Sequence, residues 1–122
     1  MHILKPVNYT FANVIGNNAL PENDFAAWAA ATSYTVGAKV IRTTTHRIYQ
    51  NLIAGVDATL PENAPNRWLD IGPTNAYAFM DAYSSTITAR ADNLTVTISP
   101  GQRISSISLI NVVGESVLIT AT

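Results

Sequence analysis

The fold is decided by residues 39–52, which read KVIRTTTHRIYQNL. β-Branched and aromatic residues fill two runs, Lys39–Thr43 and His46–Leu52, and a threonine-rich stretch separates them. Residues of these types favour extended chain, and a short polar connection between two such runs favours a turn. The stretch therefore predicts two strands joined by a turn. A third short strand is predicted at Trp68–Ile71, where Gly72 and a following proline end it.

Two tryptophans, Trp28 and Trp68, lie near the two ends of the segment 20–73 that contains these strands. If the two indoles meet, they close a β-domain too small to fold around aliphatic side chains alone. Losing one buried tryptophan typically costs about 3–5 kcal/mol. Gly37 precedes a strand and is expected to supply a turn with positive φ. The predicted scaffold core consists of Trp28, Tyr34, Gly37, Val40, Tyr49, Pro61 and Trp68.

The segment also contains a short internal echo. Leu20–Asn23 reads LPEN, Leu60–Asn63 repeats it, and a tryptophan follows each copy at the same spacing. We interpret the copies as two similar turns that each deliver a tryptophan to one core, with chance recurrence of a turn motif as the alternative. The alanine-rich stretch Asp24–Ala31 predicts one or two helical turns, capped by Asn23 or Asp24.

The second half of the chain alternates apolar and polar residues over Leu94–Ile98, and again around Ile107–Leu109 and Val117–Ala121. Turn residues lie between these runs, at 99–102 and 113–115. Alternation of this kind predicts an antiparallel β meander with one wet face. Such a sheet must be covered by the first half, by neighbouring chains, or by further residues of a longer protein.

The composition shifts near Gly72–Asn75, because both tryptophans and five of the six prolines lie before Thr74. We therefore expect a mainly β protein with an N-terminal arm (1–19), a two-tryptophan β-domain (20–73) and an antiparallel meander (74–122). The meander is similar to the opening strands of galactose-binding-like jelly rolls, which implies half of a jelly roll or sandwich.

Charge and cysteine content exclude several classes of function. Charged residues make up 12% of the chain, about half the usual share, and the formal net charge is -1. Without a basic run, neither nucleic-acid binding nor membrane attachment is expected, and no apolar stretch is long enough for membrane insertion.

The absence of cysteine excludes disulfides and thiolate zinc sites. Residues 1–16 lack the apolar run of a signal peptide, so folding in the cytoplasm is expected. Sparse charge indicates packing against protein neighbours.

Catalytic chemistry finds little support in the sequence. The two histidines, His2 and His46, have no metal-ligand spacing, and no nucleophile elbow, phosphate loop or dinucleotide fingerprint is present. Asp57 with Asp70 is the one carboxylate pair that could be imagined as a glycosidase pair, and isolated carboxylates are far more often merely solvated. We expect no enzyme activity, no metal and no cofactor.

The order Trp28, Tyr34, Gly37, Val40, Tyr49, Pro61, Trp68 resembles the small chitin-binding-type carbohydrate-binding modules of families 5 and 12. The resemblance covers about residues 21–73 and implies a three-stranded β fold. Those modules stack sugars on aromatic residues placed just after the tyrosine strand, where this chain has residues 50–54, QNLIA. The remaining candidates for glycan contact are Tyr34, Tyr49 and either tryptophan.

Residues 68–75, WLDIGPTN, are followed by Tyr77, Phe79 and Asp81. With the short lead from methionine to proline and the Pro-Glu-Asn turn, this run is similar to a group of bacteriophage and prophage virion proteins. The resemblance implies a tail-associated structural protein, an adaptor or a fibre or spike attachment domain. Such a protein would be made in the bacterial cytoplasm and would pack as a homo-oligomer with other virion proteins. The alternative is a carbohydrate-binding module that contacts host-surface glycan.

Overall fold

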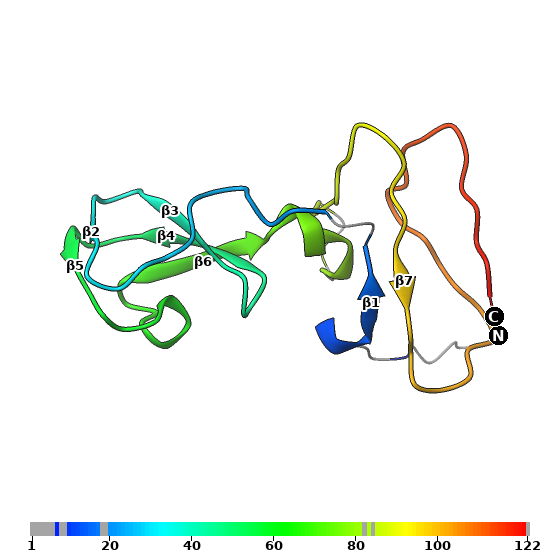
Figure 1. The fold of residues 1–122 in the computed structure, drawn as a ribbon, viewed down its shortest axis with the longest axis horizontal. Helices are drawn as coiled ribbons and strands as arrows, with labels where there is room; N and C mark the ends of the chain where they lie inside the picture. Colours follow the sequence, from blue (N-terminus) through cyan, green and yellow to red (C-terminus); the bar gives the residue numbers. More distant parts are fainter. Residues whose placement is uncertain (1–6, 8–9, 18–19, 82, 84, 122) are drawn as a thin grey trace.

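The computed structural model describes residues 7, 10–17, 20–81, 83 and 85–121. Across these residues the chain forms seven short strands in small antiparallel sheets, with three short 3-10 helices as its helical elements. The expected mainly β class is confirmed. Figure 1 shows one lobe built from β2 to β6 and a second lobe that contains β1 and β7.

The central sheet has three antiparallel strands in the order β3-β4-β6. They are β3 (Lys39–Arg42), β4 (Arg47–Asn51) and β6 (Trp68–Pro73). The three predicted strands are confirmed, with ends displaced by one or two residues. In the register, Val40 lies opposite Tyr49 and Asn51 lies opposite Trp68, so the residues meant for the core share one region of the sheet. The predicted boundary after residue 73 falls where β6 ends.

The core of this lobe is an apolar cluster of Val40, Tyr49 and Trp68, which are 1%, 5% and 2% exposed. The Tyr34 ring meets the Trp68 indole edge-on, with centroids 5.1 Å apart, and Trp28 packs against the same cluster. Edge-to-face contact is a favourable arrangement for aromatic pairs. Both tryptophans therefore reach one core, as the echoed turns suggested.

Asn51, the last residue of β4, is fully buried and binds the chain around it. Its side-chain amide donates hydrogen bonds to the carbonyls of Tyr34 (3.3 Å), Thr35 (2.9 Å) and Ile53 (2.9 Å). Its backbone carbonyl accepts from the Gly37 N–H at 2.8 Å, in a turn where Gly37 has φ +85°. One side chain thus ties the central sheet to the small ribbon of β2 (Ser33–Tyr34) and β5 (Gly55–Val56).

The predicted helix at Asp24–Ala31 is wrong. Residues 26–28 run beside β3 instead: Ile41 N–H donates to the Ala26 carbonyl at 3.0 Å, and Trp28 N–H donates to the Ile41 carbonyl at 3.0 Å. Pairing with an available strand edge satisfies the backbone groups that a helix would have bonded internally. Tertiary pairing has overridden the local preference of alanine for helix.

Both echoed LPEN turns brace the hairpin between β3 and β4. In the second copy, η2 (Pro61–Asn63) holds Glu62, whose carboxylate binds the Arg42 guanidinium through two hydrogen bonds of 2.9 and 3.1 Å. In the first copy, Glu22 pairs with the His46 imidazole on the other side of the hairpin turn. The two similar glutamates therefore hold the two ends of one turn.

The joint between the lobes is centred on His46. Its imidazole stacks on the Tyr77 ring, with centroids 3.6 Å apart, and the Phe11 ring meets it edge-on at 4.7 Å. Tyr77 belongs to η3 (Asn75–Met80), which follows β6, and Phe11 to η1 (Phe11–Asn13). The His46 carbonyl also accepts from the Thr74 N–H at 2.9 Å. The β3–β4 turn, the first LPEN turn, η1 and η3 therefore all meet at the His46 side chain.

The second lobe pairs the N-terminal part of the chain with its second half. β1 (Val14–Gly16) lies antiparallel to β7 (Thr97–Ile98). Beyond the ribbon, the Asn13 side chain donates to the Ser99 carbonyl at 2.9 Å, and Ser99 N–H donates to the Asn13 carbonyl at 2.7 Å. The segment expected to be an arm is therefore part of a two-stranded ribbon.

The predicted meander is realised only at β7. The described residues 99–121 contain no strand, and nearly all of them are exposed. Figure 1 shows this segment as extended chain that turns back on itself. Alternation gives a chain an apolar face, but a strand also needs a partner edge and a covering layer. Within this one chain, β1 gives a partner to β7 alone.

Replacing Asn51 with alanine tests its role. Asn51→Ala removes three part-buried hydrogen bonds to the carbonyls of Tyr34, Thr35 and Ile53, so the free energy of unfolding is expected to fall by about 2–4 kcal/mol. Urea denaturation followed by tryptophan fluorescence measures it. Asn66→Ala, at an exposed turn, is the matched control and should stay within about 0.5 kcal/mol of the parent. Equal stability of the two variants would contradict this role for Asn51.

Candidate functional site

The aromatic residues predicted to contact glycan are occupied in the fold. Tyr49 lies in the core, so its ring is not presented to a sugar, and the same holds for Trp68. The Tyr34 hydroxyl accepts from the Ala29 N–H at 2.8 Å, and its half-buried ring packs on the core. The Arg42 guanidinium lies 5.4 Å from the centre of the Trp28 ring. These four residues therefore belong to the core cluster or pack against it.

The carboxylates of Asp57 and Asp70 form ion pairs with different arginines. Asp57 pairs with Arg67 at 3.6 Å and accepts the Thr59 N–H at 2.9 Å. This backbone hydrogen bond is the main reason that the pKa of Asp57 lies below its ordinary value. Asp70 pairs instead with Arg47. Each of the two carboxylates is thus engaged by its own arginine.

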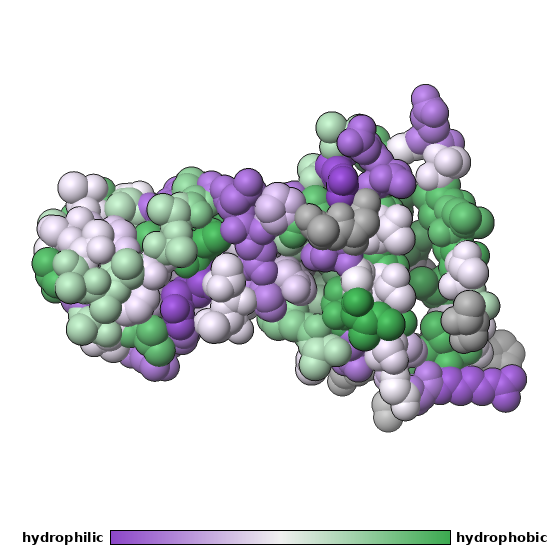
Figure 2. All heavy atoms as spheres, viewed as in Figure 1, coloured by the Kyte–Doolittle hydropathy of each residue, from purple (hydrophilic) through white to green (hydrophobic). Residues whose placement is uncertain are grey.

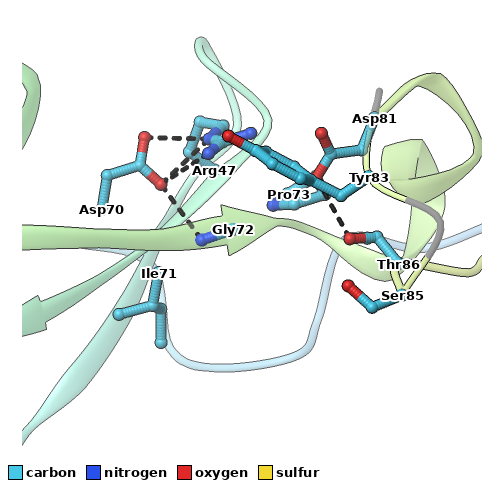
Figure 3. A pocket seen from close by; sticks show the side chains of 9 residues that line it. All are labelled: Arg47, Asp70, Ile71, Gly72, Pro73, Asp81, Tyr83, Ser85 and Thr86. Atoms are coloured by element: carbon cyan, nitrogen blue, oxygen red, sulfur yellow. Dashed lines mark hydrogen bonds and ion pairs between the residues drawn. The ribbon is translucent and has the colours of Figure 1, made fainter.

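One cleft has a volume of about 450 Å³ and lies where β6 meets the segment after η3. Figure 3 shows its two sides: one is β6 with the neighbouring Arg47, and the other carries Asp81, Tyr83, Ser85 and Thr86. The lining residues described by the structure are Arg47, Asp70, Ile71, Gly72, Pro73, Asp81, Tyr83, Ser85 and Thr86.

The first wall is organised by the ion pair of Arg47 with Asp70. The Arg47 Nε lies 3.0 and 2.9 Å from the two carboxylate oxygens, and Nη2 lies 2.9 Å from Oδ1. The Gly72 N–H also donates to Asp70 Oδ1, at 3.1 Å. The hydrogen bond that Arg47 donates to Asp70 raises the pKa of Arg47, and the nearby charge of Asp81 adds to the effect. The carboxylates of Asp70, beside Arg47, and of Asp81, on the opposite side, thus both raise the pKa of the Arg47 guanidinium.

The second wall is a loop fastened back onto η3. Asn75 exchanges two hydrogen bonds with the Ala89 backbone, of 2.8 and 2.9 Å, and the Phe79 N–H donates to Thr88 Oγ1 at 2.8 Å. Nearer the cleft, Thr86 Oγ1 donates to Asp81 Oδ2 at 3.2 Å. These bonds fix the position of the loop that carries the cleft residues.

Tyr83 is the aromatic residue of this cleft, and its side chain is unusually open. It is 71% exposed, and in Figure 3 its ring extends across the cleft toward Arg47 and Asp70. Sequence reasoning missed this residue. The available signal was a tyrosine followed by hydroxyl side chains, two residues after Asp81, in a segment with no strand pattern. Its neighbours across the cleft come from β4 and β6, which no local pattern could indicate.

A second, smaller cleft of about 250 Å³ lies on the other side of Asp70. Its residues are Tyr49, Pro61, Glu62, Pro65, Trp68, Leu69 and Asp70. Here Glu62 is committed to Arg42, at 2.9 Å, and that hydrogen bond holds the pKa of Glu62 below its usual value. The arrangement secures the β3–β4 hairpin against η2 and leaves the larger cleft as the better candidate site.

Metal and membrane sites find no support in the described part of the chain. No group of three or more His, Asp or Glu side chains lies close enough there to hold a metal ion. Among the same residues, no helix has the length and apolar character needed to cross a bilayer. Comparisons with protein-family models, with curated proteins and with solved structures find no match to this chain.

The Glu62–Arg42 pair predicts a pH-dependent stability. Because the folded pKa of Glu62 lies below its unfolded value of 4.5, its contribution is present above that pH and is lost as the pH falls through the folded pKa. The stability difference between the parent and Glu62→Gln should therefore shrink between about pH 6 and about pH 3. Urea midpoints across this range measure it. Arg42→Met removes the same hydrogen bonds and should flatten the profile similarly; an unchanged difference across the range would contradict the assignment.

Proposed function

We propose that this protein is a structural component of a bacteriophage virion, tail-associated, which acts by packing against copies of itself and neighbouring chains. The observation that carries the proposal is the uncovered apolar segment of residues 104–119. Val113 is 96% exposed and Leu118 90% exposed. The other large apolar residues exposed there are Ile104, Ile107, Leu109, Ile110, Val112, Val117 and Ile119.

Large contiguous apolar patches are rare on soluble monomers and mark interaction sites. Figure 2 shows apolar side chains on the lobe that carries β1 and β7. The segment is also extended and contains no strand among its described residues. Extended chain beside a short ribbon can add strands to a sheet formed with another chain. Association would bury the apolar side chains and pair the backbone in one step.

Charge supports packing of like chains. Residues 99–121 contain two charged side chains, Arg103 and Glu115, which have opposite signs. Copies brought together through this segment would therefore meet little like-charge repulsion, and each copy offers the other a partner for both charges. The low charge of the whole chain, 12% of residues, is consistent with extensive protein contacts.

The other lobe supports a role as a rigid attachment unit. Its fold is fixed by a buried aromatic cluster and by the Asn51 hydrogen bonds. The run WLDIGPTN that resembles virion proteins spans β6 and the start of η3, which together lead from one lobe to the other. An adaptor needs one part that is folded by itself, here the lobe of β2 to β6, and another part that assembles with neighbouring chains, here residues 99–121.

Charge introduced into the apolar segment tests the packing. Val113→Asp with Leu118→Asp would bury two unpaired carboxylates in any assembly, so sedimentation velocity should show a dissociation constant raised at least about tenfold. Val36→Asp, in which a similarly exposed valine of the other lobe is changed, is the control and should sediment as the parent does. A parent chain that is monomeric at all concentrations would refute the proposal. Mass spectrometry of purified particles from the encoding strain tests the virion assignment separately, and absence of the chain would overturn it.

A further inference from the structure

We propose that residues 116–121 pair with the same residues of a second copy as antiparallel strands, with Leu118 facing Leu118 of the other copy at a two-fold axis. The inference rests on the packing function proposed above and deepens it, because it specifies the partner, the symmetry of the contact and the register of the two strands. The pair would join the sheets of two chains edge to edge.

Residues 116–121 are extended, and no strand of the described chain pairs with them. All six are exposed; Leu118 is 90% exposed, whereas its neighbours Val117 and Ile119 are 54% exposed each. In Figure 1 this segment is the red end of the chain, along the edge of the second lobe that lies farthest from β2 to β6. Its outer side therefore faces away from the first lobe.

Symmetry restricts the register of two identical antiparallel strands. Residues directly opposite each other point to the same face of a sheet, and successive residues alternate between the two faces. A two-fold axis perpendicular to the sheet carries each face of one strand to the same face of the other. The axis must therefore pass beside one residue, which faces its own copy, because an axis between two neighbouring residues would oppose side chains from different faces. Val117, Leu118 and Ile119 are the candidates at the centre of the segment.

An axis at Leu118 sets like residues against like. Leu118 then faces its own copy, Val117 of each chain faces Ile119 of the other, and Ser116 faces Thr120. Aliphatic β-branched pairs and pairs of hydroxyl residues both stabilise antiparallel strands. This register also covers the leucine that its own chain leaves most open in this segment.

The two neighbouring registers lack this match. An axis at Val117 would set Ser116 against Leu118, and an axis at Ile119 would set Leu118 against Thr120. Symmetry produces each mismatch twice, and a hydroxyl placed against a leucine loses water without gaining a hydrogen bond from that partner. The sequence therefore favours the axis at Leu118.

The other extended leg, residues 104–110, offers no matched register. Every axis from Ser106 to Leu109 sets at least one serine against an isoleucine or a leucine. Self-pairing through this leg would therefore place hydroxyl groups against apolar side chains. Residues 116–121 are the better surface for a second copy.

Charge permits the same pairing. Residues 116–121 contain no charged side chain, and the nearest charge in sequence is Glu115. In the proposed register Glu115 faces Ala121 of the other copy, so the two glutamates are separated by six residues, about 20 Å along the strands. This distance exceeds the ~10 Å over which exposed charges interact at 0.1 M salt. Two like chains can thus approach through this edge without repulsion between their glutamates.

Engineered cysteines test the register, because the chain has no cysteine of its own. Opposite residues of an antiparallel pair have Cα atoms about 4.5–5.5 Å apart, which suits a disulfide. The full chain is oxidised with copper-phenanthroline at concentrations where sedimentation shows that the parent associates. Leu118→Cys should form disulfide-linked dimers at least about tenfold faster than the control Val36→Cys, which changes an exposed valine of the other lobe.

A second pair of variants keeps Leu118 in place. Residues two positions from the axis lie about 13 Å along the strands from their own copies, too far for a disulfide. Ser116→Cys alone and Thr120→Cys alone should therefore cross-link no faster than Val36→Cys. A mixture of the two variants should form the disulfide between positions 116 and 120 about as fast as Leu118→Cys dimerises, as mass spectrometry of the linked peptides can measure.

The outcomes separate this inference from the packing proposal. If the parent associates but neither Leu118→Cys nor the mixture exceeds the control, the register is wrong and the packing proposal stands. Equal cross-linking of Ser116→Cys alone and Leu118→Cys would show a contact without fixed register and would also refute the inference. A parent that sediments as a monomer at all concentrations refutes the packing itself, and this inference with it.

Discussion

The fold of the first lobe depends on the buried amide of Asn51. The carbonyls of Tyr34, Thr35 and Ile53, from two places in the chain, converge on one side-chain nitrogen, and buried carbonyls of this kind need a hydrogen-bond partner. The apolar cluster of Val40, Tyr49 and Trp68 provides burial, but burial alone does not specify where the β2–β5 ribbon should lie. The amide does so, because its donors and their acceptors have fixed directions. A small core can thereby hold a unique arrangement.

A second constraint acts on the turn between β3 and β4. Glu62 holds it through Arg42, Glu22 holds it through His46, and the same imidazole stacks on Tyr77. The turn is therefore both the end of the central sheet and the contact point for the second lobe. Since Arg47 starts the strand that leaves this turn, the position of the large cleft follows from the same anchoring.

The sequence predicted correctly the features that depend mainly on residues close together in the chain. The β-branched runs gave the central strands, Gly37 its positive φ, and the tryptophan spacing a shared core. It failed where distant partners decide: Ala26 and Trp28 bond to Ile41 rather than within a helix. The cleft escaped prediction for the same reason, because Arg47 and Tyr83 come from separate segments. The sequence predicted more strands after residue 94 than the structure contains. Alternation of apolar and polar residues specifies which face of a strand is apolar, but it does not specify the partner strand.

The order of these elements along the chain has a consequence for biosynthesis. Contacts of the central sheet lie within residues 26–73, whereas β1 must wait for β7, close to residue 98, before it can pair. Closing that long loop is entropically costly and comes late. During translation the first lobe can thus fold while residues 104–119 are still inside the ribosome. The exposed apolar segment 104–119 then emerges attached to a folded domain, which limits the time in which unfolded nascent chains expose it.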